Sequence, residues 1–334
     1  MYTDFSAATV ETHSTLFAAP KRSARAVALE ILGLVLPHRR IAAESEPCEL
    51  GLCEKCAGPH LSRVIASVEL GEPVVFVLPA FPGKSPNPSK VLSARADMAE
   101  RQSLAFLNEL CRRVQAVYAP GARMVLCSDG RVFSDVVGID ESDITTYQRD
   151  LSALIADLGA TALSTFNLDD VFTDCSFDAM RARLMASHGQ PLEALQAAVR
   201  EGGEPKRMYC GITRFLFEDG LRPDMTMSKT ALQKDCRRRA YEVVQRSKAW
   251  DGLLATCFPD AVRLSIHPQV CGSRKLGIHL METMDGWLTP WHGVAVEVDG
   301  SFVLRKRREV EEAGATLVFA NGRPSHYVMQ GAAS

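Results

Sequence analysis

Two short apolar runs, separated by a long amphipathic segment, constrain the fold of this chain most strongly. Residues 74–78 and 124–127 are continuous apolar runs, which is typical of strands buried on both faces of a sheet. Between them, residues 97–118 place leucine, cysteine and valine side chains on one stripe of a helix. A strand, a helix and a second strand in this order form a βαβ unit, whose strands are parallel. The sequence therefore predicts a parallel sheet.

The segments on either side of this unit extend the prediction. Residues 24–36 and 143–158 have the pattern of helices, and residues 162–168 form a third apolar run. Residues 176–250 are mostly helical in pattern, and Ser228 is a suitable N-cap for the last long helix there. A helix is therefore expected before the βαβ unit, and further helices and a third strand are expected after it.

Beyond residue 262 the pattern changes to short alternating runs, which predict strands. Asp299-Gly300 and Asn321-Gly322 are residue pairs that favour the turns of β-hairpins. The expected strands are residues 263–267, 276–280, 294–298 and 302–305.

These elements together predict the fold class. We expect an α/β fold with a Rossmann-like, mainly parallel sheet flanked by helices, a helical insertion and antiparallel C-terminal strands. Residues 1–40 would form a lead-in and a helix, and residues 41–334 a single α/β domain with its insertion at about 176–250. No stretch rich in Gly, Ser or Pro separates two halves of the chain.

The charge balance excludes several classes of partner. Lys plus Arg (38) nearly equals Asp plus Glu (40), so no overall field attracts nucleic acid or an anionic membrane. No segment approaches the run of about 20 apolar residues that spans a bilayer. The ten cysteines occur without an export signal, which favours reduced thiols. We therefore expect a cytoplasmic protein that acts on small molecules.

The loop that follows the first strand carries the most informative polar residues. It contains Lys84, Ser85, Asn87 and Lys90, and four prolines restrict its backbone. Ligands of open parallel sheets bind outside the carboxyl ends of the strands. Lysines suit a phosphate as point charges, and a hydroxyl or an amide suits a sugar. A rigid surface turn with its lysines in solvent is the alternative.

A second motif follows the next strand and should lie at the same edge of the sheet. Asp129 and Asp135 are acid/base or hydroxyl-binding candidates. Arg131 could pair with a carboxylate or phosphate, Gly130 allows a tight turn, and Ser128 precedes them. The alternative is a plain Asp-Gly hairpin that joins residues 124–127 to residues 132–137.

The second half of the chain offers further candidates. Arg214 lies in a helical pattern, and Arg263 and His267 would share one face of a strand. His267 could act as a general acid or base, although a lone strand histidine is more often structural. Trp287 and Trp291 belong to an aromatic group that could line a substrate side chain or lie in the core.

A cluster of metal-ligand types occurs near the start of the chain. Cys48, Cys53, Cys56 and His60 lie within one short segment, and three thiols with an imidazole can close a tetrahedral zinc site. Four ligands this close are crowded, and no second CxxC pair accompanies them. Free thiols near a helix start are therefore favoured over structural zinc.

The motifs together resemble the isonitrile (isocyanide) synthases, also described as PvcA-like pyoverdine/dityrosine biosynthesis proteins. The resemblance covers about residues 48 to 305 and depends on several motifs in the right order. They are Phe81-Pro82, Lys84-Ser85-Pro86-Asn87, Asp97-Met98-Ala99-Glu100, residues 118–122, residues 128–135, residues 246–250 and residues 263–269.

The resemblance implies an enzyme of secondary metabolism that condenses tyrosine or tryptophan with ribulose 5-phosphate. The α-amine would become the isonitrile nitrogen, and the keto carbon of the sugar its terminal carbon. No redox cofactor is implied, and an Fe(II)/2-oxoglutarate-dependent oxygenase would process the product.

Such chemistry needs a base for the amine, an acid for the departing water and a grip on the phosphate. The expected catalytic residues are Lys84, Asp129 and His267. The expected substrate-binding residues are Ser85, Asn87, Lys90, Ser128, Arg131, Arg214, Arg263 and Trp291. Two alternatives stay open: a non-catalytic sensor of a phosphorylated metabolite or metal, and a phosphosugar lyase that forms a Schiff base through Lys84.

Overall fold

Five parallel strands form the central sheet of the computed structural model, which describes residues 22–46, 48, 51–222 and 224–329. Their order across the sheet is β3-β2-β1-β4-β5. The strands are β1 (Val74–Pro79), β2 (Ala122–Cys127), β3 (Leu163–Phe166), β4 (Val262–Ser265) and β5 (Leu276–Gly277). The parallel pairing of β1 with β2 confirms the predicted βαβ unit.

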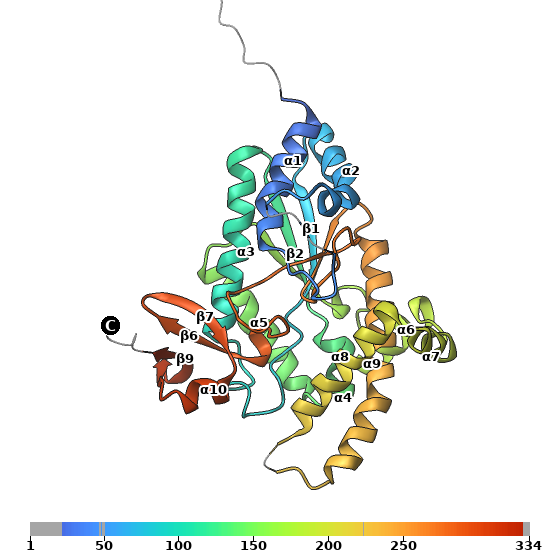
Figure 1. Cartoon of the computed structure of the whole chain (residues 1–334), viewed down its shortest axis with the longest axis vertical. Helices are drawn as coiled ribbons and strands as arrows, with labels where there is room; N and C mark the ends of the chain where they lie inside the picture. The colour runs from blue at the N-terminus through green and yellow to red at the C-terminus, as the bar shows by residue number, and fades with distance from the viewer. Residues whose placement is uncertain (1–21, 47, 49–50, 223, 330–334) are drawn as a thin grey trace, which may run out of the picture.

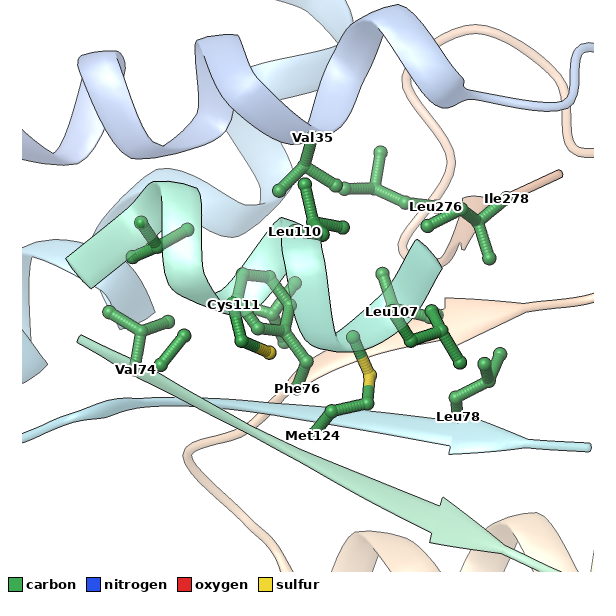
Figure 2. Packing of buried hydrophobic residues seen from close by; sticks show 14 of the residues in the cluster. Val35, Val74, Phe76, Leu78, Leu107, Leu110, Cys111, Met124, Leu276 and Ile278 are labelled. Atoms are coloured by element: carbon green, nitrogen blue, oxygen red, sulfur yellow. The ribbon is translucent and has the colours of Figure 1, made fainter. Parts of the chain in front are cut away.

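Side chains alternate between the two faces of the sheet, because successive residues of a strand point to opposite sides. Val74, Phe76 and Leu78 of β1 pack into one core cluster, whereas Val77 packs into another. Figure 2 shows the first of these faces, where Phe76 and Leu78 lie beneath Leu107 of the covering helix. Burial on both faces explains why the strand reads as an uninterrupted apolar run.

Helices cover both faces of the sheet. The first face contacts α1 (Ala24–Val35), α2 (Glu54–Leu70), α3 (Met98–Val117) and α5 (Glu141–Asp157). The opposite core cluster includes residues of α4 (Gly130–Val137), α6 (Phe177–His188), α8 (Gly203–Gly220) and α9 (Lys229–Cys257), and α7 (Leu192–Glu201) packs on α8 and α9. Among the residues that the structure describes, no helix is long and apolar enough to cross a membrane.

The C-terminal strands form a second sheet of their own, in the order β7-β6-β9-β8. They are β6 (Val294–Val298), β7 (Ser301–Arg305), β8 (Thr316–Ala320) and β9 (Arg323–Met329), with α10 (Arg307–Glu312) between β7 and β8. Asp299 and Asn321 adopt positive φ at the two predicted hairpin turns. The second sheet lies beside α3 (Figure 1).

The α/β fold class and its mainly parallel, Rossmann-like sheet are confirmed, and some local predictions are corrected. The Asp-Gly hairpin alternative is wrong, because residues 130–137 form helix α4. β4 ends at Ser265, so His267 lies in the loop beyond the strand. Ser228 caps α9 as predicted, with its hydroxyl accepting from the N–H of Ala231. The domain boundaries stay a prediction, and residues 1–21 of the expected lead-in lie outside the described residues.

Candidate active site

The two polar turns that follow β1 and β2 touch each other at the carboxyl edge of the sheet. β1 and β2 remain paired up to Pro79 and Cys127. Just beyond, the Ser128 hydroxyl donates to the carbonyl of Phe81 at 2.8 Å. A Cβ atom on Gly130 would lie only 2.0 Å from the Pro82 carbonyl oxygen, so glycine is required there. The turns therefore form one rim, as the sequence predicts.

This rim lies where the order of the strands reverses. The chain runs outward from β1 to β2 and β3, and then returns to β4 on the other side of β1. Open α/β sheets bind ligands in the crevice at such a switch point. The loops after β1, β2 and β4 are therefore the natural place for a substrate.

Lys84 is turned inward from this rim. Its ammonium lies 2.9 Å from Asp97 and 2.7 Å from Glu100, and its side chain is 0% exposed. It also donates to the carbonyl of Pro290 at 3.1 Å. Burial alone would lower the pKa of Lys84, but the two carboxylates raise it above the ordinary value. This placement suits a buried cation that holds the loop in position, and not an accessible side chain that binds phosphate.

The two carboxylates beneath Lys84 also start helix α3. Asp97 accepts from the N–H of Ala99 at 2.9 Å, and Glu100 accepts from the N–H of Asp97 at 3.0 Å, so they form a capping box. The Tyr147 hydroxyl donates to Glu100 at 3.0 Å. Burial raises the pKa of Glu100 to about 7, against the opposing effect of Lys84.

Ser85 and Lys90 converge on a carboxylate that the sequence reading missed. Asp219, near the end of α8, accepts from Ser85 at 2.7 Å and from Lys90 at 2.6 Å through its Oδ1 atom. Its Oδ2 atom is buried without a hydrogen-bond partner among the described residues. Burial raises the pKa of Asp219, although Lys90 acts in the opposite direction. A carboxylate with one unsatisfied oxygen is an acid/base candidate.

His292 faces that open oxygen. Its Nε2 atom lies 3.8 Å from Asp219 Oδ2, and its Nδ1 atom is 2.8 Å from the hydroxyl of Thr289. Burial and the nearby lysines lower the pKa of His292 well below its usual range. The ring is therefore neutral at physiological pH, with Nε2 directed at Asp219. The Phe215 ring packs edge-on against it, at 4.3 Å between centroids.

Asn87 fastens the proline-rich loop to the end of α8. Its amide nitrogen donates to the carbonyls of Glu218 and Leu221 at 2.9 and 3.1 Å. Its own oxygen accepts from the Ser89 hydroxyl at 2.6 Å. Asn87 therefore holds the backbone around Asp219, rather than presenting its amide to solvent.

Asp129 stands at the start of α4 with a buried Oδ1 atom that has no hydrogen-bond partner among the described residues. Burial raises its pKa to about 7. A carboxyl group that titrates near neutral pH suits general acid/base catalysis. Asp135, the second candidate of this motif, binds Arg246 through both oxygens at 2.6 and 2.9 Å and therefore has a structural partner.

Three arginines were expected to hold a carboxylate or phosphate, and each is already paired within the protein. The pairs are Arg131 with Asp169, Arg214 with Glu218 and Arg263 with Asp251. Arg131 also lies over the ring of Phe177, 4.1 Å from its centroid. Arg214 is the most exposed of the three, with 68% of its side chain accessible, so it is the arginine most able to exchange partners.

The aromatic group divides between the core and the surface. Trp291 is 2% exposed and packs on Phe81 with 5.4 Å between ring centroids, which favours the core alternative. Trp287 is 55% exposed, and its ring lies 6.1 Å from that of His267. Burial, together with Arg40 and Lys275, lowers the pKa of His267 to about 4, so this histidine is neutral.

Arg40 joins these loops, and no motif in the sequence indicated this role. Its guanidinium donates to the carbonyls of Ile266 and Gly286 at 2.6 Å each and to that of Leu288 at 3.0 Å. The loops that carry His267 and Trp287 are therefore joined through one buried cation. Among these additional groups, Asp97 and Glu100 had a signal in the sequence, because an Asp followed three residues later by a Glu is the spacing of a capping box.

The cysteine cluster also differs from the one expected. Among the residues that the structure describes, the thiols of Cys48, Cys53 and Cys56 gather with Cys271, and His60 is not part of the group. Cys271 comes from the loop after β4, far away in the sequence.

Comparison with known proteins decides the family. The family model described as "Pyoverdine/dityrosine biosynthesis protein" matches residues 64–318. The chain belongs to this family. The crystal structure of PvcA from Pseudomonas aeruginosa superposes with a TM-score of 0.85 at 49% identity, and covers 91% of this chain and 99% of that one.

Curated relatives specify the kind of enzyme. The chain is 52% identical to the L-tyrosine isonitrile synthase of Pseudomonas aeruginosa over 87% of its length and 88% of the relative's. It is 46% identical to the L-tryptophan isonitrile synthase AmbI2 of Fischerella ambigua, over 91% and 92% of the two chains. The resemblance seen in the sequence is thereby confirmed, and the chain is an isonitrile synthase.

Proposed function

We propose that this enzyme condenses an aromatic L-amino acid, tyrosine or tryptophan, with ribulose 5-phosphate and converts the α-amine into an isonitrile. The amino-acid class is supported by the relatives, which are named L-tyrosine and L-tryptophan isonitrile synthases. The observation that carries the proposal is the contact between the two turns at the rim. It brings an acid/base carboxyl group and a lysine-bearing loop to one edge of the sheet.

In this proposal, protons are transferred by two carboxyl groups, those of Asp129 and Asp219, each of which has a buried oxygen without a hydrogen-bond partner within the part of the chain that the structure describes. An α-ammonium group must lose a proton before it can attack a ketone, and the adduct must gain one to release water. Asp129, with its pKa near 7, can do either at neutral pH. Asp219 and neutral His292 form a second proton-handling pair. His267 is a further candidate, and burial holds it neutral as it does His292.

Phosphate binding falls to Lys90 instead of Lys84. The Lys90 side chain is 19% exposed, whereas that of Lys84 is wholly enclosed by carboxylates. Lys90 also lies 5.4 Å from the centroid of the Phe215 ring, beside His292. Arg214, on the same helix as Asp219, would reach the substrate carboxylate or the phosphate. Trp287 would line the aromatic side chain, because it is exposed near His267.

The burial of Lys84 argues against the Schiff-base alternative. A lysine must be neutral to attack a carbonyl, and this ammonium is held charged between two carboxylates. The non-catalytic sensor alternative is set aside, because the chain is an isonitrile synthase. In our proposal the reaction needs no redox cofactor, takes place in the cytoplasm, and supplies its isonitrile to an Fe(II)/2-oxoglutarate-dependent oxygenase.

The test uses labelled substrates. The full chain is incubated with ribulose 5-phosphate carrying heavy carbon at the keto position and with L-tyrosine or L-tryptophan carrying heavy nitrogen. The infrared stretch of the isonitrile should shift with each label, because both atoms of the group are then labelled. An isonitrile without the carbon label would exclude ribulose 5-phosphate as the carbon source. Absence of an isonitrile with both amino acids would contradict the proposed pair of substrates.

A further inference from the structure

Four thiols from two distant parts of the chain meet at one point, outside the rim described above. The sulfur atoms of Cys48, Cys53, Cys56 and Cys271 all lie within 4.8 Å of one another. Cys56 is 3.4 Å from both Cys48 and Cys271, and Cys53 is 3.7 Å from Cys271. Residues 53 and 56 are separated from residue 271 by 218 and 215 positions.

These separations match a tetrahedral metal site. With Zn–S bonds of about 2.3 Å, the edges of a tetrahedron of sulfurs are about 3.8 Å long. A disulfide joins only two sulfurs, at about 2.0 Å. A group of four thiols at mutual distances of this size therefore has the form of a shared ligand shell, rather than of two separate disulfides.

The local backbone supports thiolate ligands. Cys53 is the N-cap residue of α2 and Cys56 lies in its first turn, where the helix dipole favours negative charge. On the opposite side, Cys271 is held by its N–H, which donates to the Ser45 hydroxyl at 2.9 Å. Gly272 follows with φ of 81°, in the left-handed region that favours glycine.

We propose that Cys48, Cys53, Cys56 and Cys271 bind one structural Zn²⁺ ion. Four thiolates fill a tetrahedral shell and leave no open position for water, which is the arrangement of structural and not catalytic zinc. All-sulfur tetrahedral shells select zinc or iron among common metals. The sequence alone suggested His60 as the fourth ligand, and the fold supplies Cys271 in its place.

The ion has a clear structural task. It fastens the start of α2 to the loop between β4 and β5, and that loop carries His267 toward the rim. Other contacts join this loop to residues 40–42, which precede Cys48: the N–H of Gln269 donates to the carbonyl of Arg40 at 2.9 Å, and that of Ala42 to the carbonyl of Gln269 at 3.0 Å. Zinc would thus fix one wall of the active site without taking part in the reaction. Three of the four ligands precede residue 64, where the family match begins.

Metal analysis of the full chain tests this proposal. Protein purified under reducing conditions, without added metal or chelator, should contain about one zinc per chain, since structural zinc binds tightly. The Cys271→Ser variant should lose the zinc. The matched control Cys257→Ser changes an exposed cysteine outside the cluster and should keep it. A zinc content near zero in the wild-type protein, or iron in the place of zinc, would overturn the proposal.

Two further measurements cover the case in which Cys271→Ser does not fold. Exchange of the native ion for Co²⁺ in the wild-type protein should give thiolate-to-cobalt charge-transfer absorption and the strong visible bands of a tetrahedral site. Absence of these bands would contradict four-thiolate binding. The mass of the denatured, unreduced chain should correspond to ten thiols; a loss of hydrogens that indicates disulfides within the cluster would also contradict the proposal.

Discussion

The ammonium of Lys84 lies 2.7 Å from the carboxylate of Glu100, and both side chains are completely buried. Glu100 belongs to the capping box of α3, so one ion pair joins the loop after β1 to the helix that follows it. The position of the whole polar loop at the rim therefore depends on a charge network beneath it. Substrates would contact the loop that this network positions, and not Lys84, Asp97 or Glu100 themselves.

Replacing Lys84 with methionine should destabilise the protein strongly. The change leaves Asp97 and Glu100 buried without their cation, which typically costs about 3–5 kcal/mol in the free energy of unfolding. The measurement is denaturant-induced unfolding of wild type and variant. Adding Glu100→Gln to Lys84→Met should recover part of the loss, because one buried negative charge is removed. A Lys84→Met variant as stable as wild type would show that the ion pair does not hold the loop.

The carboxyl group of Asp129 should leave a signature in the dependence of stability on pH. Its pKa rises from an ordinary 3.8 to about 7 in the folded protein. The folded state therefore binds the proton more tightly than the unfolded state, and the stability from this group is present below pH 4 and lost as pH rises through 7. Relative to wild type, Asp129→Asn should become increasingly stable between about pH 4 and pH 7. Parallel stability curves for the two proteins would contradict the shifted pKa.

Asp219 should contribute to the rate of reaction rather than to amino-acid binding. General acid/base groups typically contribute factors of about 10² to 10⁴, so Asp219→Asn should lower kcat for isonitrile formation by such a factor. The matched control is Glu218→Gln, which changes the neighbouring exposed carboxylate that pairs with Arg214. Equal kcat losses in both variants would indicate a disturbed helix end, and not a proton-transfer role for Asp219.

The two tryptophans should respond in different ways. Trp291→Ala removes a large core side chain and should cost about 3–5 kcal/mol of stability. Trp287→Ala changes an exposed ring and should leave stability nearly unchanged while raising KM for tyrosine and tryptophan. Thermal unfolding and steady-state kinetics separate the two effects. An unchanged KM for Trp287→Ala would remove this ring from the substrate pocket.

Substitution of Gly130 tests whether the close contact between the turns after β1 and β2 is needed for activity. Gly130→Ala would place a Cβ atom 2.0 Å from the carbonyl oxygen of Pro82, so the turns must move apart and activity should fall by at least tenfold. Gly58→Ala, within α2, is the control, because its Cβ meets nothing within 4 Å. Full activity in Gly130→Ala would mean that the close approach of the turns is not needed.

The sequence predicted those features that depend on neighbouring residues or on a repeating pattern. The apolar runs of β1 and β2 identified the parallel strands, and parallel pairing then placed the turns after both strands on one edge. The motif Asp97-Met98-Ala99-Glu100 was visible in the sequence, but the pairing of its two carboxylates with Lys84 was not. The sequence does not distinguish a buried lysine from an exposed one. Only the fold brings two carboxylates beside Lys84.

Long-range partners explain the rest of what was missed. Asp219 lies 134 positions from Ser85 in the sequence, yet accepts a hydrogen bond from its hydroxyl. Cys271 replaces His60 in the thiol group because the loop after β4 folds back onto the start of α2. Trp287 and Trp291 are only four positions apart, yet Trp291 lies in the core and Trp287 at the surface. No local pattern distinguishes these outcomes.

The central claim is that both substrates bind at the rim formed by the turns after β1 and β2. A crystal structure with L-tyrosine and a sugar phosphate whose ketone has been reduced to an alcohol tests it most directly. We expect the phosphate within hydrogen-bond distance of Lys90, and the amine between the carboxyl groups of Asp129 and Asp219. Ligand density at another part of the molecule, with this rim empty, would contradict the account.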